Sequence, residues 1–81
     1  MIKIKNISYQ QDNVLAEVEY DIDTELYSFN VSAKQIQIAK MSVQDIKDYI
    51  IGRVVVQRST KLRDIVDSLL SGLIDVDLEE E

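Results

Sequence analysis

Apolar and polar residues alternate most regularly between Val14 and Asp23. The apolar positions of this stretch are Val14, Ala16, Val18, Tyr20 and Ile22. The positions between them are acidic after Leu15. Because successive side chains of a strand point to opposite faces, the pattern predicts a half-buried strand with one apolar face and one carboxylate face. The apolar face needs a cover, and the rest of the chain has to supply it.

A further strand is predicted on each side of this stretch. Before it, an alternation that begins at Ile2 slips by one position near Lys5 and Asn6, which predicts a β-bulge or a strand end there. After it, apolar residues alternate with serine and asparagine from Tyr27 to Ala33. Both connections are short and polar, so the three strands are expected to form an antiparallel meander with the acidic strand in the middle.

Apolar residues recur at helical spacing in two later segments. Ser42 resembles the start of a capping box and predicts a helix from Ser42 to Arg58. Ser59 and Thr60 are then expected to cap a second helix that runs to Ile74. The inward positions of the two helices are predicted to be Val43, Ile46, Ile50, Val54, Leu62, Ile65, Val66, Leu69, Leu70 and Leu73.

Two segments are ambiguous. Gly52 and the β-branched run Val54 to Val56 disfavour a helix, so Arg53 to Gln57 is either helical, which we prefer, or another strand. Gln35 to Lys40 alternates isoleucine with glutamine, and we expect it to be extended. The predicted fold is α+β, a three-stranded antiparallel meander followed by two helices packed on one sheet face (β-β-β-α-α). Residues 1–74 form one small domain, and residues 75–81 form an acidic tail that frays.

Composition excludes much site chemistry. The 81 residues include no cysteine and no histidine, which removes disulfides, thiolate and imidazole metal ligands and the commonest general base. Asp21, Asp23 and Glu25 have the first spacings of a calcium loop but lack its later glycine and glutamate. No phosphate loop or nucleophile motif is present. We therefore expect no enzyme, cofactor, metal site or small-molecule substrate.

The start of the chain lacks the apolar core of a secretory signal, and no run approaches the roughly 20 apolar residues of a membrane span. We therefore expect a cytoplasmic protein without membrane contact. Small, proline-free chains that lack cysteine and histidine are common among bacterial and phage accessory proteins, and an origin in a phage or mobile element is our working hypothesis.

Charge is unevenly distributed along the chain. The net charge is −6, most of it from the acidic residues at the C-terminal end. An acidic face is predicted on the central strand, at Glu17, Glu19, Asp21 and Asp23. A basic joint is predicted between the two helices, at Arg53, Arg58, Lys61 and Arg63. The acidic face suggests an alternative function, an acidic mimic that inhibits a nucleic-acid-binding protein. The basic joint suggests another, weak binding of nucleic acid, although four basic residues are few for such a surface.

The first predicted helix has more apolar residues than one buried stripe needs. The surplus consists of Tyr49, Ile51, Gly52, Val55 and Val56. Such a surplus is typical of a helix covered on two sides. If Val54 to Val56 form a core strand instead, nothing is left over. We prefer the first interpretation and predict a non-catalytic interaction or assembly module that self-associates, or docks to another protein, through this helix.

Overall fold

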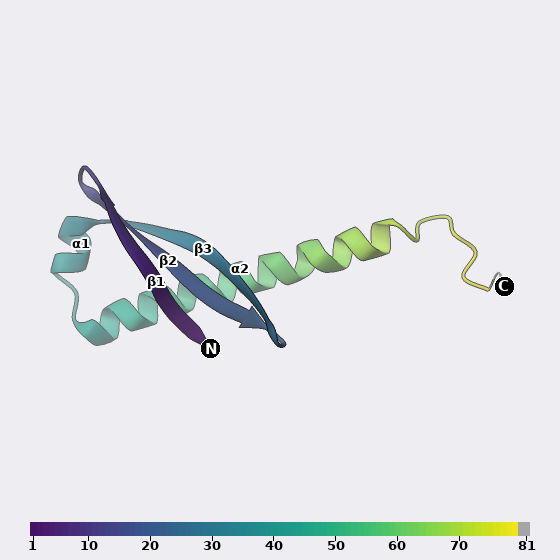
Figure 1. Ribbon diagram of the computed structural model, residues 1–81, viewed down its shortest axis with the longest axis horizontal. Coiled ribbons are helices and arrows are strands. Elements are labelled where there is room, and N and C mark those ends of the chain that lie inside the picture. The colour runs from purple at the N-terminus through teal and green to yellow at the C-terminus, as the bar shows by residue number, and fades with distance from the viewer. Residues whose placement is uncertain (80–81) are drawn as a thin grey trace.

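Three consecutive strands form an antiparallel meander in the computed structural model, which describes residues 1–79 (Figure 1). The strands are β1 (Ile2–Gln10), β2 (Asn13–Ile22) and β3 (Glu25–Lys34), with β2 in the middle as predicted. Each hairpin turn has two residues, and in each the first residue, Gln11 or Asp23, has a positive φ. Glycine usually takes such positions, and here the chain uses polar residues instead.

The register confirms the slip in the pattern of the first strand. Pairing of β1 with β2 shifts between Ile4 and Asn6, so Lys5 is the extra residue of a bulge. The shift returns the apolar residues on both sides of the bulge to one face of the sheet. Ile4 pairs with Val18, and Ile7 pairs with Ala16.

The segment that we expected to be extended, Gln35 to Lys40, forms the short helix α1 (Gln35–Ala39) instead. The side-chain amide of Gln35 donates to the carbonyl oxygen of Gln11 at 2.8 Å, and its backbone N–H donates to the carbonyl oxygen of Asp12, also at 2.8 Å. These bonds tie the end of β3 to the β1–β2 turn, so the chain turns there and the ladder ends. The alternation of Ile36 and Ile38 did not reveal this.

One continuous helix, α2 (Val43–Ser71), replaces the two helices that we predicted over Ser42–Arg58 and Thr60–Ile74. The start is confirmed, because Ser42 Oγ accepts a hydrogen bond from the N–H of Asp45. Arg53 to Gln57 is helical. Thr60 does not act as a cap, because its hydroxyl donates to the carbonyl oxygen of Val56 one turn earlier and so fits inside the helix. The α+β class, with strands first and helices after them, is as predicted.

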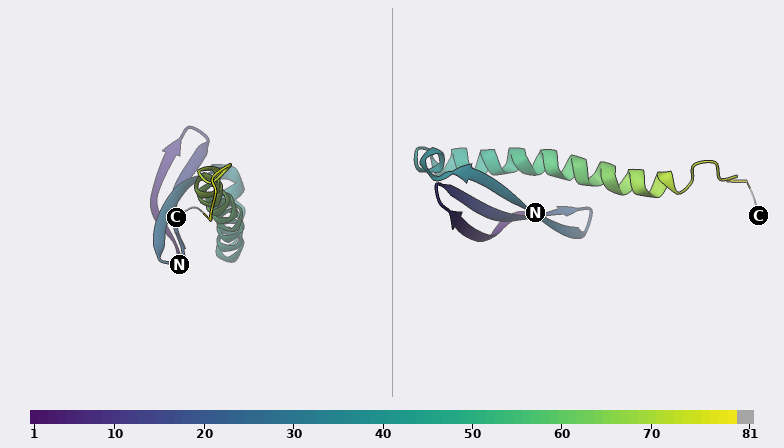
Figure 2. Two further views of the ribbon diagram at one scale, coloured as in Figure 1. Left: turned by 90° about the vertical axis from the view of Figure 1, so that its right-hand side faces the viewer. Right: turned by 90° about the horizontal axis from the view of Figure 1, so that it is seen from above.

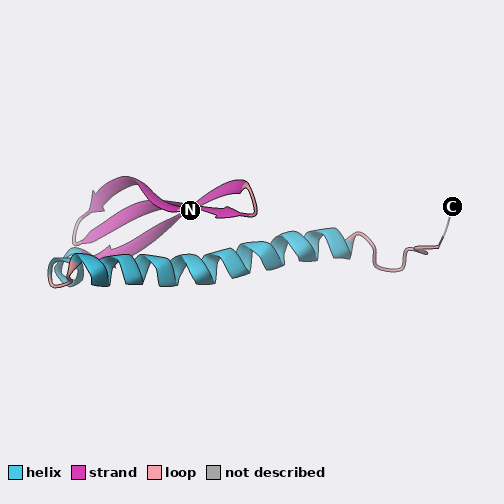
Figure 3. Ribbon diagram, turned by 90° about the horizontal axis from the view of Figure 1, so that it is seen from below, coloured by secondary structure: helices cyan, strands magenta, loops and turns pink. Residues whose placement is uncertain are grey.

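Helix α2 crosses the strands obliquely, from the β1 side of the sheet to the β3 side, and emerges beyond β3 (Figures 1 and 3). Contacts along the helix follow this path. Lys47 and Ile51 line a hollow together with residues of β1, and Arg58 Nε donates to the carbonyl oxygen of Asp21 in β2 at 3.0 Å. Lys61 Nζ lies 5.1 Å from the ring centre of Tyr27 in β3.

The core is smaller than the sequence predicts. Its five buried apolar residues lie where α2 crosses the sheet, at Val18, Tyr20, Val31, Ile50 and Val54. The ring of Tyr20 packs edge-on against Phe29, with centres 5.7 Å apart. Several helix residues that we assigned to the core are exposed, namely Val43, Leu62, Val66, Leu69, Leu70 and Leu73, and Ile4 of β1 is exposed as well. The molecule is 60 Å long and only 24 by 17 Å across, because α2 extends well past the sheet (Figure 2).

Candidate protein interface

A row of exposed apolar side chains runs along one side of α2 and into the turn that follows it. The residues of this apolar row are Ile51, Val55, Leu62, Val66, Leu69 and Leu73. Steps of three, four and seven residues keep a side chain on the same side of a helix, so these residues form a single band. Each of them is between 43% and 69% exposed, whereas Val54, one position from Val55, is 0% exposed.

The dimensions of the two elements explain this exposure. A helix of 29 residues is about 43 Å long at 1.5 Å per residue. Three strands spaced by about 4.8 Å make a sheet only about 10 Å wide between the outer strand axes. Because α2 crosses the strands and does not run along them, the sheet covers its first half and contacts the second half only near its start, at Lys61. The second half, from Ser59 to Ser71, is called the projecting half below.

The five residues of the predicted interface do not form one patch. Ile51 and Val55 belong to the apolar row. Val56 lies about 100° around the helix from Val55 by the helical repeat and so outside the row, and Tyr49 faces a hollow that it lines together with Ile38 of α1. Gly52 has no atom within 4 Å of the position that a Cβ would take, so no group of the described chain needs a glycine there. The prediction located an exposed helix and missed the four row residues beyond Arg58, although their spacing was visible in the sequence.

The predicted basic joint does not exist, because the helix is continuous there. Arg58 and Lys61 point toward the sheet, where they contact Asp21 and Tyr27. Arg53 and Arg63 are exposed on other sides of α2. The four bases are therefore spread around the helix and do not form a single surface for phosphate.

The acidic face is also smaller than predicted. Asp21 binds two cations: its carboxylate lies 2.8 Å from the N-terminal ammonium group of Met1 and 3.7 Å from the guanidinium of Arg58. The hydrogen bond from this ammonium group is the main reason why the pKa of Asp21 lies below its ordinary value of 3.8. Glu19 stands opposite Lys3 in the sheet. The other two members of the predicted face are Glu17 and Asp23. Within residues 1–79, neither pairs with a basic residue on a neighbouring strand and neither forms a salt bridge.

A small polar cluster lies near the β2–β3 turn, where β3 meets α2. The hydroxyl of Tyr27 donates to a carboxylate oxygen of Glu25 at 2.9 Å, and this bond raises the pKa of Tyr27 above its ordinary value of 10.0. Lys61 lies over the same ring. The last part of the sheet to touch α2 is therefore held by a polar cluster, and beyond it the apolar row of the helix is exposed.

Within residues 1–79 no three acidic side chains come together in a way that would hold a metal ion. None of the helices in this range has the length and apolar character needed to cross a membrane. The fold and the apolar row define a small α+β domain with an open helix face. Comparison of the chain with models of known protein families, with characterised proteins and with solved structures finds no match.

Proposed function

We propose that the protein is a non-catalytic assembly module that associates with a second copy of itself through the apolar row of α2, in the cytoplasm. The observation that carries the proposal is the projecting half of α2, a regular helix in which the apolar side chains of Leu62, Val66 and Leu69 are exposed. A helix of this composition is stable in water when its apolar side is covered. An extended exposed apolar band on a small domain marks an interaction surface.

A second copy fits the row because the row has the same spacing in both copies. Positions Val55, Leu62 and Leu69 repeat every seven residues, and Val66 and Leu73 repeat at the intervening steps. This is the pattern with which two helices interlock side chains along a seam. The one charged residue at this spacing is Arg58, between Val55 and Leu62, and its guanidinium is turned to Asp21 of the sheet.

The free energy gained by covering the row is of the same order as the free energy that association costs. Covering a half-exposed Leu or Val yields about 1 kcal/mol, half of the value for complete burial. Over both copies this amounts to roughly 12 kcal/mol, and the cost of association is estimated at about 4 to 15 kcal/mol. The gain from the row and the cost of association therefore nearly balance, and a second contact would strengthen the dimer.

The test is the molar mass in solution, measured by light scattering after size exclusion at several concentrations. The wild type is expected to exceed the 9.3 kDa of one chain as the concentration rises. Substitutions Val66→Glu and Leu69→Glu place a charge in the row and are expected to return the mass to that of one chain. A wild type that stays at 9.3 kDa at millimolar concentration contradicts the proposal.

The matched control is Thr60→Glu. Thr60 is exposed on the side of α2 away from the row, and this substitution adds the same charge to the same half of the helix. It is expected to leave the mass of the wild type unchanged. If all three variants dissociate equally, net charge and not the row controls association.

A further inference from the structure

The two edges of the sheet differ in how they are protected. An open edge exposes unpaired backbone groups to other chains, and lysines and bulges commonly guard it. Strand β1 has both devices, Lys3 and Lys5 and the bulge between Ile4 and Asn6. Strand β3 pairs with β2 over ten residues without a register shift, and between its end residues, Glu25 and Lys34, it has no charge and no proline.

The hairpin geometry determines which groups of β3 face outward. Ile22 and Glu25 close a two-residue turn, and such a closing pair exchanges both of its hydrogen bonds. Alternate residues therefore bond to β2, and the residues between them direct N–H and C=O away from the sheet. These are Leu26, Ser28, Asn30 and Ser32. Within residues 1–79, no hydrogen bond from another element reaches their backbone groups.

We propose that the second contact is strand pairing, in which β3 of one copy joins β3 of the other in antiparallel orientation about a two-fold axis at Asn30, giving a continuous six-stranded sheet. The inference rests on the proposed self-association and names its geometry. It is an isologous contact, because each copy contributes the same strand. The two Asn30 residues then exchange both backbone hydrogen bonds across the axis.

The side chains of β3 suit this pairing. On the outer face Ser28 stands opposite Ser32 of the second copy, so both are small and polar. On the inner face Phe29 stands opposite Val31 of the second copy, a favourable aromatic and β-branched pair. The charges lie only at the two ends of the strand, so antiparallel pairing brings Glu25 close to Lys34 of the second copy. A parallel arrangement would place like charges together.

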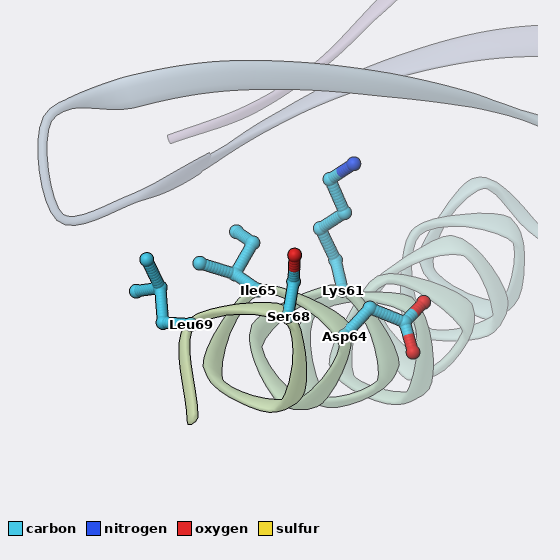
Figure 4. A pocket seen from close by; sticks show the side chains of 5 residues that line it. All are labelled: Lys61, Asp64, Ile65, Ser68 and Leu69. Atoms are coloured by element: carbon cyan, nitrogen blue, oxygen red, sulfur yellow. The ribbon is translucent and has the colours of Figure 1, made fainter. Parts of the chain in front are cut away.

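The projecting half of α2 lies where the added strands would be. It emerges past β3, on the side of the sheet that the helix covers (Figure 1). Lys61, Ile65, Ser68 and Leu69 line a hollow on this side, and Figure 4 shows Lys61, Ile65 and Ser68 pointing from the helix toward the side of the sheet. A strand added beside β3 therefore stands over Ile65 and Leu69. The second copy would thus pair with β3 through its own β3 and at the same time cover part of the projecting half of α2.

The test uses single cysteines, which the natural chain lacks. Asn30 and Asn6 are matched positions, because both pair with Glu17, one on each side of β2. In the proposed dimer the Cα atoms of the two residues 30 lie about 5.5 Å apart, within disulfide range. Those of the two residues 6 are separated by five strand spacings, about 24 Å. Asn30→Cys is expected to form a covalent dimer on mild oxidation, and Asn6→Cys is not.

Spin labels on the same two cysteines give the distances without a disulfide. A short separation at position 30 and a long one at position 6 support the strand pairing. A dimer by mass in which the labels at position 30 are far apart overturns this inference and leaves the proposed self-association intact. A wild type that is monomeric under all conditions overturns both.

A backbone variant tests the hydrogen bonds themselves. Asn30→Pro removes an N–H that faces away from β2, a change that an edge strand tolerates. Two bonds are lost across the axis, so the dissociation constant is expected to rise at least tenfold, while Asn30→Ala, which keeps the N–H, changes it little. Circular dichroism of both variants checks that the monomer is folded. Equal dissociation constants for the folded proline and alanine variants contradict strand pairing.

Discussion

Both halves of α2 carry regularly spaced apolar residues, but only the first half is packed against the sheet. In the first half Ile50 and Val54 are buried against the sheet, and Val54 is completely covered. In the projecting half Leu62, Val66 and Leu69 recur just as regularly and are exposed. The difference lies in the direction of the helix, which crosses a narrow sheet and leaves it after Lys61. Periodicity therefore tells which residues share a side of a helix, and only the tertiary structure tells what covers that side.

The largest effect is expected from a charge in the packed half. Val54→Asp places a carboxylate where nothing can pair with it, which costs several kcal/mol. A domain of this size has a stability of about 5 kcal/mol, so the variant is expected to lose its fold. Circular dichroism at 25 °C measures this. A cooperative thermal transition like that of the wild type would show that Val54 is not in the core.

The neighbouring substitution Val55→Asp sharpens the comparison. Val55 is 57% exposed and belongs to the apolar row. The variant is expected to keep its helical signal and to change the free energy of unfolding of the monomer by less than about 1 kcal/mol. Its molar mass is expected to fall to that of one chain. An unfolded Val55→Asp would mean that the two sides of α2 are equally buried.

Replacing Gly52 by alanine tests whether the helix needs a close approach at this point. Nothing in the described chain lies within 4 Å of the added Cβ, so the expected result is a gain of about 0.5 to 1 kcal/mol from the better helix propensity of alanine. Urea unfolding of the monomeric protein measures it. A gain in stability with loss of association would instead place Gly52 within the interface.

The smallest effect concerns Asp21, where the sheet and α2 meet. Its pKa is lowered in the folded state, first by the hydrogen bond from the N-terminal ammonium group of Met1 and also by nearby positive charges, among them Arg58. The carboxylate therefore stabilises the fold at pH values above the ordinary pKa of 3.8, and this stabilisation is lost as the pH falls through the lowered pKa.

Asp21→Asn is expected to flatten the decline of stability below pH 4, as measured by urea unfolding at a series of pH values. Glu17→Gln on the outer face is the control, with an acid profile like that of the wild type. An unchanged profile in Asp21→Asn would show that the two cations do not stabilise the folded state through this carboxylate.

The strands could be predicted from the sequence because their signals are local. Alternation predicted the meander, and its slip near Lys5 and Asn6 predicted a bulge or a strand end where the structure has a bulge. The helix boundary could not be predicted in the same way, because a serine or threonine that can cap a helix can also bond within it, as the hydroxyl of Thr60 does with Val56. The short helix α1 depends on bonds from Gln35 to a turn that is distant in the sequence.

The candidate site was predicted in part. The sequence indicated a surplus of apolar residues on α2, and Ile51 and Val55 are on the exposed row. Leu62, Val66, Leu69 and Leu73 were assigned to the core from their helical spacing, but a three-stranded sheet is too narrow to cover them. The unguarded β3 edge was visible as a strand without internal charge, but only the topology shows that this strand is at the edge.

Hydrogen exchange at low and high protein concentration tests the central claim most directly. If a second copy covers the projecting half of α2, the amides from Leu62 to Ser71 gain protection as the concentration rises, while those of the central strand β2 change little. Protection of Leu62 to Ser71 that is independent of concentration over the range in which the mass increases would contradict the account.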